Sequence, residues 1–159
     1  ISVDLNFNML MHGKEKVKNN SNKISWINCN AENLPFKKNT FDKYIISFCL
    51  RNITIIDHAL NEAIRVLKPG GSFYCLEFST PKSSFVNTVY NFYKSEIIPL
   101  IGERIAKNKK AYRYLEESIS EFPNQNILLS KLNEIGFKNT SVINLFNGIV
   151  SIHKGFKIL

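Results

Sequence analysis

The sequence feature that most constrains the fold is a strand–helix–strand pattern in the middle of the chain. Phe41–Leu50 and Ser72–Phe78 are strand-like apolar runs, and Ile55–Leu67 between them carries apolar residues at helical spacing. A helix of this length typically connects two parallel strands of one sheet through a right-handed crossover. Because Phe41–Leu50 is almost continuously apolar, we expect its strand to be covered on both faces. The pattern predicts an α/β fold.

The segment before this unit predicts a shorter strand–helix–strand pattern. Ile1–Asp4 is typical of the end of a strand, and Asn6 or Asn8 is positioned to cap a following helix. That helix should fade at Lys18–Asn22, where Asn and Ser side chains compete for the backbone. Ile24–Cys29 is the next predicted strand.

The segment after the central unit predicts three helices and a final hairpin. Lys68–Gly71 ends the central helix with a proline and a glycine pair, and Gly136 should end the last helix. Asn147-Gly148 is typical of a tight turn between two antiparallel strands. The elements expected are helices over Phe85–Ile97, Ala111–Ile119 and from Phe122–Asn124 to Ile135, then strands over Phe137–Phe146 and Ile149–Ile158.

Length and composition describe one globular domain without a nucleic-acid signature. The chain has 159 residues, 44% of them hydrophobic, and a formal charge of +8. Its lysines are scattered, with short clusters only at Lys37-Lys38 and 107–110, and no aromatic platform for RNA accompanies them. We attribute the charge to compositional bias and expect no nucleic-acid partner. No apolar run approaches the ~20 residues that span a bilayer.

The cysteines and histidines show no metal-binding pattern. Cys29, Cys49 and Cys75 lie in apolar, strand-like runs without metal-ligand spacing, and the three histidines are isolated from one another. We therefore expect three buried, reduced thiols and no metal site.

Polar residues directly after two successive strands predict a ligand site. Asn30–Glu32 follow one predicted strand, and Arg51-Asn52 follow the next. In open α/β sheets, ligands bind in the crevice beyond the carboxyl ends of the strands. Arg51 stays charged and suits an anionic oxygen. The same two residues could instead cap the next helix, or Arg51 could pair with Glu77.

Several segments spread over essentially the whole chain are similar to those of one enzyme family. They are Asn30-Ala31-Glu32 with Leu34-Pro35-Phe36, Asn39–Asp42, Ser47-Phe48 with Leu50-Arg51-Asn52, Arg65–Gly71, Leu76–Ser79, Tyr112–Leu115 with Glu117-Ser118, and Gly136-Phe137. The Leu-Lys-Pro-Gly-Gly portion is common to many class I methyltransferases, whereas Ser47–Asn52 and Tyr112–Leu115 are more particular. On these residues the chain resembles the ubiquinone and menaquinone biosynthesis C-methyltransferase family.

The resemblance implies a Rossmann-like class I methyltransferase fold and the cofactor S-adenosyl-L-methionine. The sheet should be mostly parallel with an antiparallel last strand. Asp4 matches the acid that holds the ribose hydroxyls, because its two carboxylate oxygens can accept a hydrogen bond from each hydroxyl. The alternative is that Asp4 caps the following helix. Asn30 and Ala31 match the adenine-edge position, and Ser47 matches a further cofactor contact. Glu32 remains open between a surface acid and a contact beside the adenine.

The resemblance also implies the catalytic and substrate-binding residues. Arg51 would stabilise a phenolate and Asn52 would orient the ring or a proton-accepting water. Tyr112, Arg113 and Tyr114 match the family's cover over the active site, although an ordinary amphipathic helix with one core tyrosine explains them equally well. The implied reaction is C-methylation of a polyprenyl benzoquinol or of demethylmenaquinol.

Two alternatives to this function stay open at the level of sequence. One is a methyltransferase acting on another small molecule, and the other is a non-catalytic scaffold in a quinone-biosynthesis complex. A lipid-like quinol implies peripheral membrane contact, for which the aromatic Phe85–Ile101 region is the candidate; a cover over the sheet or a homodimer interface is the competing interpretation. The expected location is intracellular: the matrix side of the mitochondrial inner membrane in a eukaryote, otherwise the cytoplasm.

The family's first strand and glycine-rich loop have no counterpart among residues 1–159. That strand would lie at the centre of the sheet, and without it strand edges would keep unpaired amides and carbonyls. We therefore expect a single methyltransferase domain that is incomplete at its amino terminus, and that on its own neither folds stably nor methylates. Cooperative melting of these 159 residues alone would contradict this expectation.

Overall fold

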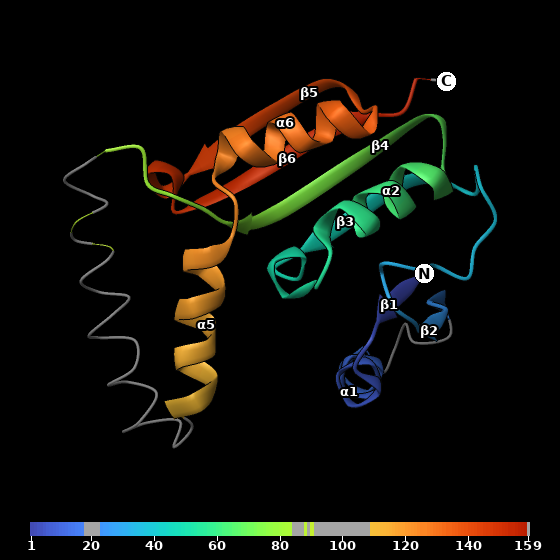
Figure 1. Ribbon diagram of the computed structural model, residues 1–159. Coiled ribbons are helices and arrows are strands. Elements are labelled where there is room, and N and C mark those ends of the chain that lie inside the picture. The colour runs from blue at the N-terminus through green and yellow to red at the C-terminus, as the bar shows by residue number, and fades with distance from the viewer. Residues whose placement is uncertain (18–22, 84–87, 89, 91–108, 159) are drawn as a thin grey trace.

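The computed structural model describes residues 1–17, 23–83, 88, 90 and 109–158, arranged in two separate sheets (Figure 1). The smaller sheet pairs β1 (Ser2–Asp4) with β2 (Trp26–Asn28) in parallel, and α1 (Phe7–Lys16) connects them. Asn6 caps α1, because its side-chain oxygen accepts the N–H groups of Asn8 and Met9.

The larger sheet has four strands in the order β3-β4-β6-β5. β3 (Phe41–Ser47) and β4 (Leu67–Phe78) are parallel, and β6 (Val150–Phe156) is antiparallel to both β4 and β5 (Lys138–Leu145). β3, β4 and β5 therefore run in one direction and the last strand runs against them. This confirms the predicted α/β sheet with an antiparallel last strand.

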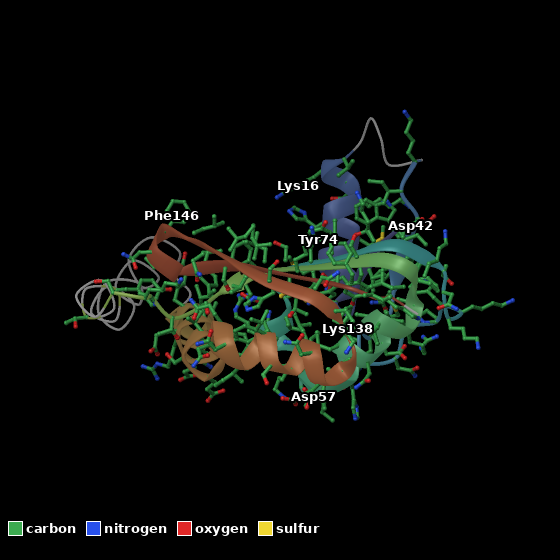
Figure 2. All side chains as sticks on the ribbon, turned by 90° about the horizontal axis from the view of Figure 1, so that it is seen from above. Lys16, Asp42, Asp57, Tyr74, Lys138 and Phe146 are labelled. Atoms are coloured by element: carbon green, nitrogen blue, oxygen red, sulfur yellow. The ribbon has the colours of Figure 1, made fainter. Side chains whose placement is uncertain are left out.

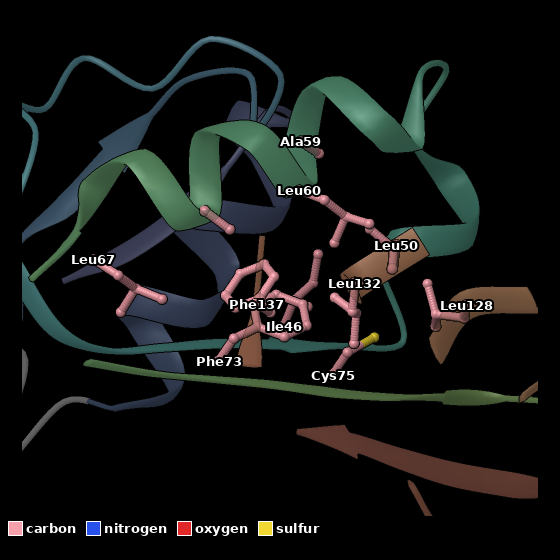
Figure 3. Packing of buried hydrophobic residues seen from close by; sticks show 11 residues of the cluster. Ile46, Leu50, Ala59, Leu60, Leu67, Phe73, Cys75, Leu128, Leu132 and Phe137 are labelled. Carbon is pink, nitrogen blue, oxygen red and sulfur yellow. The ribbon is translucent and has the colours of Figure 1, made fainter. Parts of the chain in front are cut away.

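Two helices cover one face of the four-stranded sheet. Figure 1 shows α2 (Ile56–Val66) and α6 (Gln125–Ile135) side by side in front of the strands. Between helices and sheet lies the main core (Figure 3). Its buried members are Ile46, Leu50, Ala59, Leu60, Ala63, Leu67, Phe73, Cys75, Leu128, Leu132 and Phe137. The helical apolar spacing of Ile55–Leu67 is thus explained by its packing on the sheet.

The other face of this sheet is open in the part of the chain that the structure describes. Figure 2 shows Tyr74 pointing to the side opposite the helix that carries Asp57. Ile45 in β3 is 71% exposed and Ile143 in β5 is 57% exposed. The expectation that Phe41–Leu50 is covered on both faces is therefore wrong for the described residues. The apolar run is real, but only one of its faces meets described helices.

The boundaries of the central unit differ from the prediction at two turns. β3 stops at Ser47 because Phe48 turns to φ 51°, and a short 3-10 helix, η2 (Leu50–Asn52), follows. β4 begins at Leu67 rather than Ser72, since Leu67 already pairs with Phe41 before an irregularity in the register.

The predicted end signals of the later elements are confirmed. Asn124 caps α6, and Gly136 ends it at φ 112°. Asn147 and Gly148 both have positive φ in η4 (Phe146–Gly148), which joins β5 to β6. α5 (Lys109–Glu121) includes the predicted helix 111–119, whereas the predicted helix 85–97 lies outside the described residues except for 88 and 90.

The three cysteines differ in burial. Cys75 is buried as expected and Cys29 is half-buried, but Cys49 is exposed because the strand ends before it; all three are free thiols. Among the described residues, no helix combines the length and apolar character needed to cross a membrane.

Candidate active site

The carboxyl ends of β1, β3 and β4 bring three charged residues into one region. Asp4 is the last residue of β1, Arg51 lies in η2 just after β3, and Glu77 lies near the end of β4. The pKa of Cys49, between these ends, is raised first by desolvation and then by the negative charges of Asp4 and Glu77. Of the three charged residues, Arg51 and Glu77 are in direct contact, with Arg51 Nη1 3.0 Å from Glu77 Oε1.

Arg51 is held against Glu77 in a nearly dry environment. Arg51 Nη1 donates to Glu77 Oε1 at 3.0 Å and to the Phe48 carbonyl at 2.6 Å. The side-chain exposures are 10% for Arg51 and 0% for Glu77. The guanidinium carbon lies 5.4 Å from the centre of the Phe78 ring, within cation–π range. The pairing that the sequence left open is therefore made.

The turn that carries Arg51 is strained. Phe48 has φ 51°, a conformation that is unfavourable for a bulky residue. Its N–H donates to the Leu76 carbonyl at 2.8 Å and its ring lies 4.9 Å from that of Phe78. Backbone strain of this kind persists only where the surroundings hold it and is concentrated at functional sites.

Asn52 is contacted by one of the predicted substrate residues. The Tyr114 hydroxyl on α5 donates to Asn52 Oδ1 at 3.1 Å, across 62 positions in the sequence. Tyr114 is 54% exposed, Arg113 is exposed and Tyr112 is half-buried. The structure therefore places α5 beside η2 through Tyr114. The roles of Tyr112 and Arg113 remain predictions.

The four predicted cofactor residues lie at strand ends or just after them. Asp4 is half-buried, and its Oδ1 accepts the Asn6 N–H at 2.8 Å, which fixes the carboxylate beyond β1. Asn30 is exposed and its Oδ1 accepts the Glu32 N–H, while Ala31 packs against the core. Ser47 is exposed at the end of β3. Their cofactor roles stay predictions.

Two glutamates hold the loop between β2 and β3, and one of them, Glu32, belongs to the polar residues predicted for the ligand site. Glu32 Oε1 accepts the N–H of Ile55 at the start of α2, at 3.0 Å. Glu62 accepts the Leu34 N–H at 2.7 Å and pairs with Arg65. The ion pair lowers the pKa of Glu62. Glu32 thus has a structural role at a helix start, which its sequence position did not distinguish from a ligand contact.

The arrangement combines a fixed cation, a carboxamide and a phenol at the carboxyl ends of the strands. Arg51 can bind an anionic oxygen, and Asn52 and Tyr114 can orient a planar ring. Within the described ranges, no group of three His, Cys, Asp or Glu side chains is arranged to hold a metal ion.

Comparison with known proteins identifies the family. A sequence model described as the ubiE/COQ5 methyltransferase family matches residues 1–157. The chain belongs to this family. This confirms the family resemblance inferred from the Ser47–Asn52 and Tyr112–Leu115 segments, and the Arg51–Glu77 pair is therefore part of a methyltransferase-family fold.

Two relatives of this family member illustrate how far the match extends. The chain is 46% identical over 157 residues to the mitochondrial 2-methoxy-6-polyprenyl-1,4-benzoquinol methylase of Bos taurus, covering 98% of this chain and 48% of that protein. It is 43% identical over 159 residues to the ubiquinone/menaquinone biosynthesis C-methyltransferase UbiE of Cronobacter sakazakii, covering 99% and 63% respectively. The chain thus spans about half the length of the bovine relative.

Solved structures show the same fold. A SAM-dependent methyltransferase of Thermotoga maritima, described as a possible histamine N-methyltransferase, superposes with a TM-score of 0.70 at 19% identity over 99% of this chain and 72% of that one. A phosphoethanolamine N-methyltransferase 2 of Haemonchus contortus, solved with S-adenosyl-L-methionine, superposes with a TM-score of 0.70 at 16% identity. The match covers 99% of this chain and 43% of that one. These likenesses confirm the class I methyltransferase fold.

Sequence reasoning missed two features of the site. It treated Glu77 as a partner of Arg51 or of a backbone loop rather than as a general base, and did not recognise that one carboxylate would contact both the backbone and the side chain of Arg51. It did not connect Tyr114 with Asn52, because nothing in the local pattern shows that α5 returns to η2. The apolar run Phe73–Leu76, which leads directly into the carboxylate of Glu77, was the available signal for Glu77.

Proposed function

We propose that the whole protein containing this chain uses S-adenosyl-L-methionine to methylate a ring carbon of a polyprenyl benzoquinol or of demethylmenaquinol. The observation that supports this most directly is the arrangement at η2. A buried acid fixes Arg51, and the adjacent Asn52 contacts Tyr114 on a helix that the family resemblance assigns to the active-site cover. The proposal agrees with the names of the bovine and Cronobacter relatives.

The chemistry asks three things of the protein. The ring carbon must be electron-rich, the ring must be aligned with the methyl donor, and one proton must leave. Arg51 stabilises the phenolate oxygen that makes the neighbouring ring carbon nucleophilic. Asn52 orients the ring or the water that accepts the proton lost from that carbon. Tyr112, Arg113 and Tyr114 bind the ring from α5 and exclude water.

The residues at the ends of β1, β2 and β3 fit the cofactor. Asp4 has a carboxylate fixed at the strand end by the Asn6 N–H, suited to paired hydroxyls. Asn30, Ala31 and Ser47 lie at or after the neighbouring strand ends, where this class of sheet binds its ligands. When bound there, S-adenosyl-L-methionine supplies the methyl group on a positively charged sulfur.

The proposal includes where the protein acts. In a eukaryote the protein would act on the matrix side of the mitochondrial inner membrane, where it reaches a polyprenyl quinol by peripheral contact; otherwise it would act in the cytoplasm. The relatives named as mitochondrial support the mitochondrial part of this proposal. A homodimer or a quinone-biosynthesis complex would fit the same role. A methyltransferase on another small molecule and a non-catalytic scaffold remain the competing functions.

Methyl transfer by the whole protein tests the proposal. The protein is incubated with S-adenosyl-L-methionine carrying a labelled methyl group and with a reduced short-chain analogue of each quinol, and ring methylation is followed by mass spectrometry. Arg51→Ala should lower turnover at least a hundredfold while changing the affinity for S-adenosylhomocysteine less than threefold. Equal turnover in this variant and its parent would remove Arg51 from the mechanism. Absence of methylation on both quinols would favour the scaffold.

A further inference from the structure

We propose that Glu77 is a positioning residue for the proposed methyl transfer, fixing the direction of the Arg51 guanidinium. This inference rests on the proposed function. Glu77 is fully buried and is therefore shielded from a substrate. It acts through Arg51, whose side chain keeps one-tenth of its surface exposed.

The same carboxylate holds both the backbone and the side chain of Arg51. Glu77 Oε1 accepts Arg51 Nη1 at 3.0 Å and the Phe78 N–H at 2.9 Å, and Oε2 faces the Arg51 N–H at 3.4 Å. The carboxylate thus bridges the end of β4 to η2. A bridge of this kind fixes where η2 lies as well as where its guanidinium points.

Three groups around the guanidinium determine its position. Arg51 Nη1 donates to the Phe48 carbonyl at 2.6 Å and to Glu77 Oε1 at 3.0 Å, and the guanidinium carbon lies 5.4 Å from the centre of the Phe78 ring. Glu77 is the one of these three that carries an opposite charge.

The strained turn is an independent sign of the same constraint. Phe48 keeps φ 51° while its carbonyl accepts Arg51 Nη1 at 2.6 Å. The turn at Phe48 therefore places the carbonyl that accepts from the guanidinium. Strain that is tied to one side chain in this way is expected where that side chain must be preorganised.

Position and charge make opposite predictions for Glu77→Gln. If Glu77 only neutralised Arg51, its removal would leave a stronger cation and raise turnover. If Glu77 positions Arg51, the isosteric amide loosens the guanidinium and turnover falls about tenfold to a hundredfold. Glu77→Asp, which keeps the charge but withdraws the carboxylate, should also lower turnover.

A double-mutant comparison in the whole protein separates positioning from a general structural role. Glu77→Gln should lower turnover in the parent but have no further effect in the Arg51→Ala background, with the affinity for S-adenosylhomocysteine unchanged. Glu62→Gln is the matched control: Glu62 also accepts a backbone N–H and pairs with an arginine, but outside the site. Its effect should be the same factor in both backgrounds. An equal loss from Glu77→Gln with and without Arg51 would overturn the inference.

A spectroscopic measurement keeps the inference testable if the proposed reaction fails. Relaxation of the Arg51 Nε–H signal in the ¹⁵N-labelled whole protein reports how rigidly the guanidinium is held. Glu77→Gln should increase its motion, and Glu62→Gln should leave it unchanged. A guanidinium equally rigid in Glu77→Gln and parent would refute the positioning role. Failure of methyl transfer in the parent with a rigid Arg51 would instead refute only the proposed reaction.

Discussion

Replacing Arg51 by alanine should destabilise the fold far more than replacing Lys68, although both take part in ion pairs of nearly equal length. Arg51 lies 3.0 Å from Glu77 and Lys68 lies 2.9 Å from Asp42. The first pair is 10% and 0% exposed, whereas the second is 45% and 80% exposed. Burial, and not distance, therefore decides the difference.

The magnitude follows from what remains after the substitution. Arg51→Ala leaves the Glu77 carboxylate buried with the Phe78 N–H as its close donor. An uncompensated charge of this kind costs about 3–5 kcal/mol. Glu77→Gln in the same chain removes that charge, so the double variant should regain at least half of the loss. Lys68→Ala removes a pair that water already screens and should have little effect.

Urea denaturation of the whole protein, followed by circular dichroism, measures these differences. The expected order of unfolding midpoints is parent and Lys68→Ala highest, the double variant intermediate and Arg51→Ala lowest. The reasoning is refuted if Arg51→Ala costs no more than Lys68→Ala. It is also refuted if removing Glu77 gives no recovery.

Three further substitutions test other parts of the account. Asp4→Ala should weaken binding of S-adenosylhomocysteine at least tenfold in a calorimetric titration, and unchanged affinity would exclude Asp4 as the ribose ligand. Tyr114→Phe loses the hydrogen bond to Asn52 and should raise the KM for the quinol several-fold with unaltered cofactor binding; an unaltered KM would separate α5 from substrate binding. Burial lowers the pKa of His153 below its ordinary 6.5, so its stabilising contribution is complete above that pH and is lost as the pH falls further. His153→Gln should flatten the fall in stability below pH 6.5, and an identical pH profile would show that other groups cause it.

Local signals in the sequence were sufficient for most elements of the fold. The cap at Asn124, the left-handed Gly136 and the Asn147-Gly148 turn are set by residues next to one another, so the sequence shows them directly. The parallel pairing of β3 and β4 follows from the length of the helix between them. The predicted end of β3 was wrong because a single backbone angle, the positive φ of Phe48, determines where that strand stops.

The burial of β3 could not be predicted, because it depends on what covers the sheet. An apolar residue such as Ile45 has the same sequence signature whether a described helix meets it or not. The contact between Tyr114 and Asn52 was equally inaccessible, since it depends on how a distant helix returns to the sheet edge. The position of Arg51 and Asn52 just after a strand, by contrast, could be predicted, since both lie in η2 directly beyond β3. Their roles in a site stay predictions.

The most direct test of the central claim is the structure of the whole protein bound to S-adenosylhomocysteine. The account predicts that both ribose hydroxyls lie within hydrogen-bond distance of the Asp4 carboxylate, with the sulfur facing the η2 turn that carries Arg51 and Asn52. A cofactor bound away from the ends of β1 and β3, or a sulfur facing away from η2, would contradict the assignment of this region as a methyl-transfer site.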